Sequence, residues 1–392
     1  MIAPQTPAAG ALAGLTLIEL EGIGPAPMAA MLLADMGASV LRIQRRDPVA
    51  QGIPREARYN LLLRNRTSVE LDLKRSDSKA LVLDLIENAD ALIEGFRPGV
   101  MERLGLGPDA CLARNPRLVY GRVTGWGQAG PLAQAAGHDI NYLALTGALE
   151  AIGRQGQPPT PPLALLGDFA GGGLYLALGI LAALIERARS GLGQVVDAAM
   201  VDGVASLSTA LHGLAAAGIW RAERGTNLID SGAPFYDVYA CSDGRYVSVG
   251  PLEAKFFSQL LTLLALPEEL AAWQADRARW PALRERLAQA FAGRSRDEWT
   301  ARLEGTDACF APVLSFDEAP NHPHLRARRT FVEVGGIAQP APAPRLSRSA
   351  APPISPVSAP LRGTAALAAL GRWLAPAALE RARTQGLFEE TR

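Results

Sequence analysis

The first 125 residues alternate short apolar runs with segments of helical periodicity, and this alternation restricts the fold more than any other feature. Residues 15–19 (LTLIE) read as a strand, ELEGIGPAP as a turn, MAAMLLADMGA as a helix and residues 40–43 as a second strand. VELDLK, DALIEG and RLVYGRV continue the series as strands, and SKALVLDLIENA as a helix. Because such units close by right-handed crossovers, the pattern predicts an α/β fold with a large Rossmann-like domain on a mostly parallel sheet.

The pattern changes near residue 227, where a smaller domain is expected. FYDVYACSDGRYVSVG alternates around a Ser-Asp-Gly turn, which is a hairpin signal, and helical segments follow it. Residues 336–362 are rich in Pro, Ala and Ser and should be extended chain on a surface, before one final helix, ALAALGRWLAPAALERARTQG. We expect residues 1–200 to form the first part of the large domain, 201–226 a linker helix, 227–325 a small α+β domain, and 326–392 a return segment and C-terminal helix that complete the large domain.

Charge and cysteine content narrow the range of partners. The chain has 39 Lys and Arg against 39 Asp and Glu, so no overall field attracts nucleic acid or a membrane, and neither is an expected partner. Cys111, Cys241 and Cys309 lie far apart, with no C-x-x-C and no neighbouring histidine at metal-ligand spacing. We expect core thiols of a cytoplasmic protein and no metal site.

Two apolar stretches could be mistaken for export or membrane signals. The N-terminal segment lacks a basic region and contains early prolines and two glutamates, which makes it a poor secretory signal. Residues 169–185 (FAGGGLYLALGILAALI) are at the short limit for a membrane span and carry three glycines near their start. The expected structure is a buried helix packed closely on a neighbour.

Residues 22–27 (GIGPAP) match a dinucleotide-binding fingerprint only in part, because Pro27 replaces the third glycine. The second strand is followed by arginines, among them Arg45, where an NAD site requires a carboxylate. A phosphate of NADP or of coenzyme A would suit these arginines. A tight βα turn followed by a solvated basic loop explains them equally well.

Cationic residues follow two other predicted strands. Arg97 lies in EGFRPG, and Asp72, Leu73, Lys74 and Arg75 follow the preceding strand. Ligands of open α/β sheets bind outside the carboxyl ends of the strands, so these groups could converge on a polyanion, although each alone is an ordinary surface charge.

GHDINY and GDFAGGG contain the residues best suited to proton transfer. His138 precedes an apolar run, but Asp139 is a poor partner for it because adjacent helical residues do not face each other. Asp168 heads a glycine-rich helix, where a carboxylate can serve simply as an N-cap. From the residues alone, a structural role is the stronger interpretation for both.

Five long motifs, in order, resemble the class III CoA-transferase family, and its acyl-CoA racemases in particular. They are GHDINYLALTG, LLGDFAGGGLYLALGILAAL, GQVVDAAMVDG, GAPFYDVYACSDGRYVSVGPLEAKFF and DACFAPVL, and the similarity runs from about residue 12 to at least 346. The resemblance implies an intertwined homodimer, with the active site between the large domain of one chain and the small domain of the other. It implies a 1,1-proton transfer that interconverts R and S 2-methyl-branched acyl-CoA thioesters through an enolate, with no cofactor besides the thioester substrate itself.

The same resemblance implies a set of site residues. His138 and Asp168 would be catalytic, and Glu253 in VGPLEAKFF would contact the histidine, in cis or in trans. The implied coenzyme A contacts are Arg45, Asp72, Leu73, Lys74, Arg75, Arg97, Arg103, Gly137, Asp139, Ile140, Asn141 and Tyr142.

This assignment agrees with the chemistry of racemisation, which needs one group to remove the α-proton and another to return a proton on the opposite face. His138 and Asp168 can supply both. We expect N–H groups of residues 167–171 to stabilise the enolate oxygen, and the glycines after Asp168 to let the thioester approach the backbone. Glu253 would fix the imidazole tautomer, which Asp139 cannot easily do.

Three other functions remain open at this stage. A CoA-transferase of the same family would use Asp168 as a nucleophile, although that mechanism has no need of His138. An NADP-dependent oxidoreductase would rely on the incomplete glycine fingerprint. A non-catalytic CoA-binding protein would leave His138, Asp168 and Glu253 without a common purpose.

Overall fold

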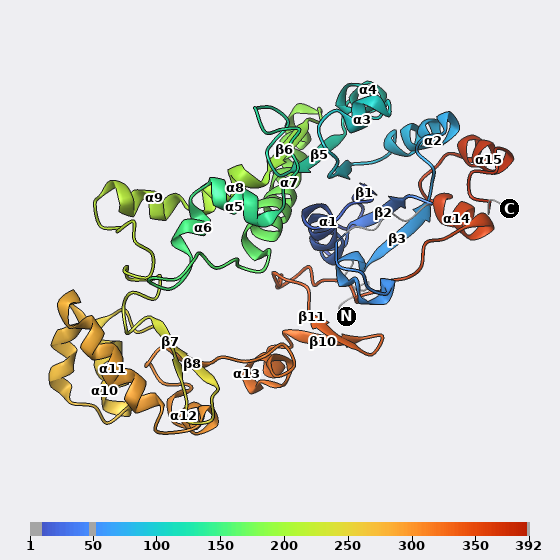
Figure 1. The fold of residues 1–392 in the computed structure, drawn as a ribbon. Helices are drawn as coiled ribbons and strands as arrows, with labels where there is room; N and C mark the ends of the chain where they lie inside the picture. The colour runs from blue at the N-terminus through green and yellow to red at the C-terminus, as the bar shows by residue number, and fades with distance from the viewer. Residues whose placement is uncertain (1–9, 47–51, 390–392) are drawn as a thin grey trace. The chain divides into compact units, whose positions relative to one another are not determined.

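A computed structural model describes residues 10–46 and 52–389 of the chain (Figure 1). It divides into two compact units. Unit 1 comprises the described residues within Met1–Thr146, Leu163–Leu207 and Arg329–Arg392, and unit 2 comprises Gly147–Pro162 and Ser208–Arg328. The chain therefore leaves unit 1 twice and returns twice, and residues 147–162 group with unit 2, although the sequence pattern had placed them in the large domain.

Unit 1 is built on a six-stranded sheet of order β3-β2-β1-β4-β5-β6, and every neighbouring pair is parallel. The predicted parallel α/β sheet is confirmed. The strands are β1 (Thr16–Leu20), β2 (Ser39–Gln44), β3 (Arg66–Glu70), β4 (Ala91–Glu94), β5 (Val119–Thr124) and β6 (Val195–Ala199). Strand β3 ends at Glu70, earlier than expected, so residues 72–75 form the turn before α2. The strand order reverses between β1 and β4, which is where open α/β sheets bind ligands.

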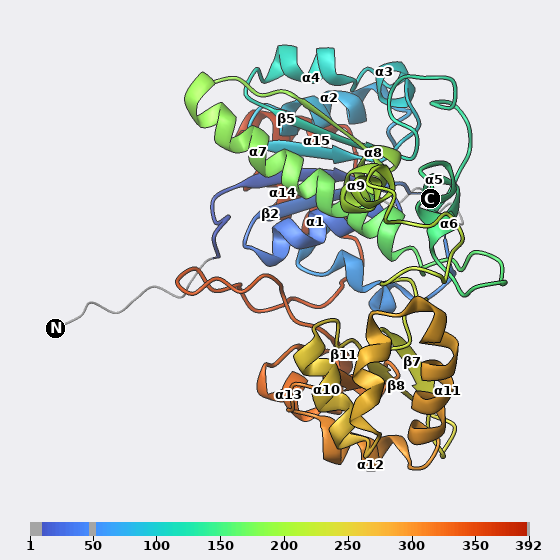
Figure 2. The same ribbon diagram turned by 90° about the vertical axis from the view of Figure 1, so that its left-hand side faces the viewer.

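Helices cover both faces of this sheet (Figure 2). One face packs against apolar side chains of α1 and α7, and the other against α2, α14 and α15. The helices of unit 1 are α1 (Pro25–Asp35), α2 (Ser76–Ile86), α3 (Val100–Arg103), α4 (Pro108–Arg114), α5 (Asp139–Leu145), the π-helix η3 (Leu165–Leu174), α7 (Tyr175–Ser190), α8 (Met200–Leu207), α14 (Gly363–Leu370) and α15 (Pro376–Thr384), with short 3₁₀ turns η1 (Ala57–Tyr59) and η2 (Leu61–Leu63).

The apolar segment expected to be a buried helix is η3 followed by α7. By length and composition, the run Leu165–Ser190 would be able to cross a membrane, and 39% of its most apolar window is buried. One face of α7, including Leu176 and Ile180, lies in the core. The other face exposes Leu178 (62%) and Ile185 (68%), and Leu174 (49%) at the end of η3 is exposed as well. The expectation of a buried helix thus holds for one face only.

The glycines of this segment serve helix packing. A Cβ on Gly172 would lie 2.7 Å from Pro25 Cβ, and one on Gly173 would lie 2.8 Å from Met28 Cγ, so α1 approaches the backbone of η3 directly. Gly171 meets Val204 of α8 in the same way, at 2.9 Å. These glycines are buried against protein, so they do not leave room for a thioester as the sequence had suggested.

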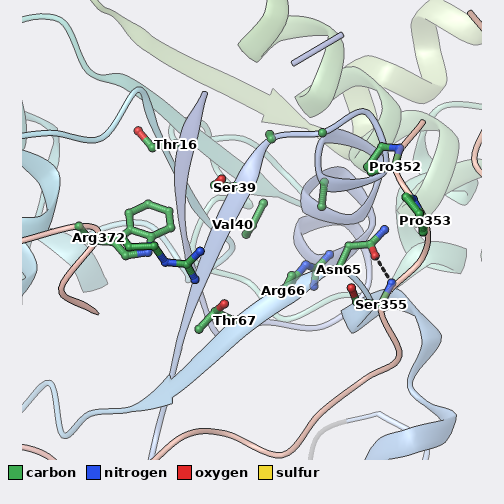
Figure 3. A pocket seen from close by; sticks show the side chains of 14 residues that line it. Thr16, Ser39, Val40, Asn65, Arg66, Thr67, Pro352, Pro353, Ser355 and Arg372 are labelled. Atoms are coloured by element: carbon green, nitrogen blue, oxygen red, sulfur yellow. Dashed lines mark hydrogen bonds between the residues drawn. The ribbon is translucent and has the colours of Figure 1, made fainter. Parts of the chain in front are cut away.

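The Pro-rich C-terminal segment is more ordered than expected. Its first residues form strand β11 (Ile337–Pro340), which pairs in an antiparallel hairpin with the preceding strand β10 (Phe331–Val334), and Leu361 later bridges to Val69 of β3. Between β11 and Leu361 the segment passes the amino ends of the strands of the sheet. There the Ser355 N–H donates to Asn65 Oδ1 at 2.6 Å (Figure 3). The single C-terminal helix predicted from sequence is two helices, because the break between α14 and α15 contains Gly371 and Pro376 starts the second.

Unit 2 has its own core around a three-stranded antiparallel sheet. Strands β7 (Asp237–Ala240) and β8 (Tyr246–Val249) form the expected hairpin, and β9 (Phe310–Pro312) pairs with β8. The helices are α6 (Ala148–Ala151), α9 (Thr209–Ala216), α10 (Ala254–Leu263), α11 (Trp280–Phe291), α12 (Arg296–Leu303) and α13 (Pro323–Ala327), with 3₁₀ turns η4 (Glu268–Gln274), η5 (Arg277–Arg279) and η6 (Ala319–Asn321). The expected linker helix is therefore two helices, α8 and α9, one in each unit.

Candidate active site

A cavity of about 520 Å³ lies in unit 1 at the carboxyl ends of β1, β4, β5 and β6, which includes the reversal point of the sheet. Its lining includes Glu21, Phe96, Arg97, Trp126, His138, Tyr142 and Asp168. The structure thus brings His138 and Asp168, thirty positions apart, to the same cavity. The two belong to different elements, the start of α5 and the π-helix η3.

Asp168 lies within the first turn of η3, so it is not the N-cap that the sequence suggested; Ala164 has that place. A Cβ built on Gly24 would lie 2.8 Å from Asp168 Oδ2, so the carboxylate rests against the glycine that precedes α1. Gly24 has φ +64°, which disfavours a side chain there as well. Burial, together with the charge of Asp139, raises the pKa of Asp168 to about 6, against the opposing effect of His138. A carboxyl group with a pKa near neutrality is suited to both accept and donate a proton.

Asp139 is buried, at 8% exposure, and points to η3. Its Oδ1 accepts the backbone N–H of Asp168 at 2.7 Å. A Cβ on Gly167 would lie 2.4 Å from the same oxygen, so only glycine fits beside it. The sequence did not indicate this contact with Asp168, and the expectation that Asp139 does not orient His138 stays a prediction. Because the carboxylate is engaged inside the protein, a contact between Asp139 and coenzyme A would have to involve its backbone.

His138 is the exposed N-cap residue of α5. Its backbone N–H donates to Oδ1 of Asn141 at 3.0 Å, which fixes the start of the helix. Tyr142 donates its hydroxyl to the Gly137 carbonyl and packs edge-on against Trp126, with ring centroids 4.8 Å apart. These contacts give Asn141 and Tyr142 structural roles in holding the GHDINY segment. The exposed Ile140 lies on the same turn.

Arg97 reaches the cavity from the loop after β4. That loop is held by Glu94, which accepts the Phe96 N–H at 2.7 Å and the Arg122 Nε–H at 2.7 Å. Arg122 also donates to Glu102 of α3 at 2.8 Å. The buried charges under the loop are therefore paired, and Arg97 itself is exposed.

The remaining cationic candidates lie around the same edge of the sheet. Arg45 follows β2, its N–H donates to Glu21 Oε2 at 2.8 Å, and its guanidinium lies 5.7 Å from the Phe96 ring centroid. Arg103 is exposed on α3. These contacts bring Arg45 next to the cavity, because Glu21 and Phe96 both line it.

Residues 72–75 differ from one another in whether their side chains are free to contact coenzyme A. Arg75 already binds the Asp77 carboxylate through two N–H groups, and Asp72 accepts the Lys74 N–H at 2.9 Å. Leu73 packs against the core of unit 1. Lys74 is exposed, and its side chain has no carboxylate partner among the described residues, unlike that of Arg75. A phosphate would have to compete with Asp77 for Arg75.

Glu253 belongs to unit 2, where it is exposed at the N-cap of α10. Partial burial, and to a smaller extent the charge of Glu253, raise the pKa of the Cys309 thiol. The Gly250 N–H in VGPLEAKFF donates to the Cys309 carbonyl in DACFAPVL at 2.9 Å. The two motifs therefore lie side by side in unit 2. Contact of Glu253 with His138 stays a prediction.

Sequence reasoning did not select several lining residues. Glu21 directly follows β1, and Trp126 lies in the loop just after β5, as Arg97 lies in the loop after β4. The signal that could have identified them is this shared position, since residues after parallel strands meet at one edge of the sheet. Trp126 lies in TGWG, where an aromatic residue between glycines marks a tight turn at a strand end.

The partial dinucleotide fingerprint is explained by packing. Gly24 makes room for the Asp168 carboxylate, where a dinucleotide site would place its pyrophosphate at the helix N-terminus. An acid at this position repels a phosphate once it is ionised. The geometry therefore argues against an NADP-dependent oxidoreductase.

The chain is similar to several known proteins along most of its length. The chain is 46% identical over 343 residues to α-methylacyl-CoA racemase from Mus musculus, covering 87% of this chain and 88% of that protein, and 44% identical to its Homo sapiens counterpart, covering 88% of each. It is 31% identical to acetyl-CoA:oxalate CoA-transferase from Acetobacter aceti, covering 84% of this chain and 88% of that protein. The fold matches a crystal structure of a CAIB/BAIF family protein from Brucella suis with a TM-score of 0.79 and 25% identity, covering 93% of this chain and all of that one. The profile of CoA-transferase family III matches residues 12–364, and the chain belongs to that family.

Proposed function

We propose that this protein is an acyl-CoA racemase that interconverts the R and S epimers of 2-methyl-branched acyl-CoA thioesters. The observation that carries the proposal is that His138 and Asp168 line one cavity at the reversal point of the sheet. The α-methylacyl-CoA racemases from mouse and human, at 46% and 44% identity, support the same activity.

The chemistry divides between the two residues. With the α-carbon between them, the ionised carboxylate of Asp168 removes the proton from one epimer and the imidazolium of His138 returns a proton on the opposite face. For the other epimer the neutral imidazole removes the proton and the protonated Asp168 returns one. A pKa of about 6 lets Asp168 perform both parts near neutral pH.

The enolate oxygen needs hydrogen-bond donors, and the turn at residues 167–171 is a poorer source than the sequence suggested. The Asp168 N–H is taken by Asp139, and the Phe169 N–H donates to the Ala164 carbonyl at 3.3 Å. The start of α5 is better placed, because the first N–H groups of a helix have no intrahelical acceptor. We propose that the backbone N–H of Asp139, next to His138, supports the enolate.

Coenzyme A would lie along the same edge of the sheet, with Arg97 at the cavity and Arg45, Lys74 and Arg103 as further cations. The thioester is the substrate, and the proposed reaction requires no other cofactor. The runner-up function is CoA transfer with Asp168 as nucleophile, which the family membership and the exposure of Asp168 to the cavity also allow.

One experiment separates these two functions. A single-epimer 2-methylacyl-CoA incubated with the protein in D₂O should lose its optical purity and gain deuterium at the α-carbon. If neither change occurs, and a new acyl-CoA instead forms when a free carboxylic acid is added, the protein is a transferase. A panel of aliphatic, steroid and aryl-propionyl thioesters in the same assay identifies the acyl group.

Arg97→Ala should weaken coenzyme A binding with a smaller effect on kcat. Arg97 is an exposed cation at the cavity. It belongs to the loop after β4, whereas His138 and Asp168 belong to α5 and η3. Losing one charged hydrogen bond corresponds to a rise in Kd of roughly tenfold to a hundredfold. Calorimetric titration with coenzyme A measures it, and Lys79→Ala on α2 is the control; equal affinities for both variants would contradict the assignment.

We propose that the protein is a homodimer, as the resemblance implies. The exposed apolar side chains of Leu174 at the end of η3 and of Leu178 and Ile185 on α7 support this, because large exposed apolar patches are typical of interaction surfaces. Leu178→Arg should shift the sedimentation coefficient towards that of a monomer, whereas Gln289→Arg on the exposed face of α11 should not. A wild-type protein that sediments as a monomer would contradict the proposal.

A further inference from the structure

Asp139 is in direct contact with Asp168, one of the two proposed proton-transfer residues. The mechanism above gives the Asp139 carboxylate no function. Asp139 Oδ1 accepts the Asp168 N–H at 2.7 Å across 29 positions of sequence. Asp139 is also the first residue of α5 and follows His138 directly. One side chain therefore joins the segment that carries His138 to the π-helix that carries Asp168.

The fit around this contact is tight. The position that a Cβ of Gly167 would occupy is 2.4 Å from Asp139 Oδ1 and 3.3 Å from the Asp139 carbonyl oxygen. The carboxylate thus lies directly against the backbone of η3. On its other side, the Asp168 carboxylate is held against Gly24, 2.8 Å from the Cβ position there. Asp139 thus holds the backbone of Asp168, and Gly24 lies against its side chain.

We propose that Asp139 is a positioning residue for the racemase reaction: its carboxylate sets the separation of His138 and Asp168, and its negative charge favours the protonated form of Asp168. The proposal rests on the proposed function for its kinetic consequences only. The contact itself, and its effect on the titration of Asp168, hold whatever the reaction is.

The charged and titratable groups around Asp168 are few. From α5 they are Asp139, His138 and Tyr142, and Arg97 and Glu21 line the same cavity. Burial raises the pKa of Tyr142 to about 12, so it stays neutral. The side chains of α1 and α8 that lie nearest to the glycines of η3 are Pro25, Met28, Met200 and Val204, none of which titrates. The titratable residue of α8, Asp202, is exposed. For Asp168, burial raises the pKa most, Asp139 raises it further, and His138 lowers it.

The direction of the pH effect follows from these signs. Racemisation in either direction uses the form of the His138–Asp168 pair that carries one proton, so the rate profile is bell-shaped for both epimers. Removing the negative charge of Asp139 makes it harder to add a proton to the pair. The acid limb of the profile, where the pair takes up its second proton, therefore moves to lower pH in Asp139→Asn.

Two variants separate the charge from the hydrogen bond. Asp139→Asn keeps an oxygen that accepts the Asp168 N–H and loses the charge, whereas Asp139→Ala loses both. We expect Asp139→Asn to retain a kcat within about tenfold of wild type at its own optimum. For Asp139→Ala we expect a loss of roughly 10²-fold in kcat with little change in KM, because misplacing a catalytic group by about 1 Å costs that much.

The test combines kinetics with a direct titration. Aspartate labelled with ¹³C at Cγ, with Asp168 assigned through Asp168→Asn, reports the pKa of Asp168 by NMR in the full-length protein without any substrate. Asp202→Asn is the control, because it removes an exposed carboxylate from α8, the helix next to η3. We expect a lower pKa for Asp168 in Asp139→Asn and an unchanged one in Asp202→Asn. Far-ultraviolet circular dichroism shows whether each variant is folded.

Any of three results would overturn the proposal. The first is an unchanged Asp168 titration in Asp139→Asn. The second is a folded Asp139→Ala protein with the wild-type kcat, and the third is an Asp139→Asn protein as slow as Asp139→Ala. If the NMR shift appears but the wild-type protein exchanges no α-proton, the Asp139 contact stands and the racemase function falls.

Discussion

Replacing Asp168 with asparagine, or His138 with alanine, is expected to reduce the rate of racemisation by roughly 10²–10⁴-fold, the usual contribution of a general acid or base. Each variant retains only one of the two groups that line the cavity. Such a protein can still remove and return a proton on one face of the α-carbon. In D₂O it should exchange the α-proton of one epimer without changing its configuration.

The two variants should act on opposite epimers. Asp168→Asn retains His138 and exchanges the epimer that presents its proton to the imidazole, and His138→Ala exchanges the other one. The measurement is deuterium incorporation and optical purity for each epimer separately, with coenzyme A affinity as the control for binding. Rates within about tenfold of wild type for both variants would be too high for a general acid-base pair. Exchange of the same epimer by both variants would contradict the two-sided arrangement.

Replacing Arg66 with methionine should destabilise the protein by about 3–5 kcal/mol, because it leaves a buried carboxylate without its partner. Arg66 Nη1 lies 3.1 Å from Glu19 Oε2, and both side chains are 0% exposed. Arg66 also donates to the Pro27 carbonyl of α1. The pair therefore joins β1, β3 and α1 in the interior of unit 1, and neither Glu19 nor Arg66 lines the candidate active-site cavity. Urea unfolding at pH 7 measures the change.

Two controls define the origin of this loss. Arg58→Met removes one member of a pair whose side chains are 61% and 68% exposed and should change the free energy of unfolding by about 0–1 kcal/mol. The double variant Glu19→Gln/Arg66→Met should recover part of the stability, because no charge is then buried alone. A double variant as unstable as Arg66→Met would show that packing, and not the stranded charge, causes the loss.

The loss should also depend on pH. Burial raises the pKa of Glu19, and Arg66 counteracts this, so the pKa rises further in Arg66→Met. A carboxyl group with a raised pKa binds a proton in the folded state that the unfolded chain has released. Destabilisation therefore increases as pH rises from the unfolded value of about 4.5 through the folded value, and the deficit of Arg66→Met should be smaller at pH 5 than at pH 8.

The sequence by itself determined the fold class and the kind of residues at the site. Alternating strand and helix patterns predicted the parallel sheet, because periodicity and turn residues are local properties that need no knowledge of neighbours. The long motifs around His138, Asp168 and Glu253 indicated the family, and the family profile over residues 12–364 confirms it. The cytoplasmic location and the contact between Glu253 and His138 remain predictions.

Only the tertiary structure decided which neighbours these residues have. The role of Asp139 depends on η3, which begins 20 residues after α5 ends, and periodicity carries no information about such a contact. The glycines of η3 looked available to a ligand, but α1 and α8 pack on them. The buried face of α7 packs on the sheet, where Leu176 and Ile180 meet Gly121 of β5, and the opposite face is exposed. Distances between segments arise from packing, so the motif GHDINY shows that Asp139 follows His138 but not that its carboxylate contacts the backbone of Asp168.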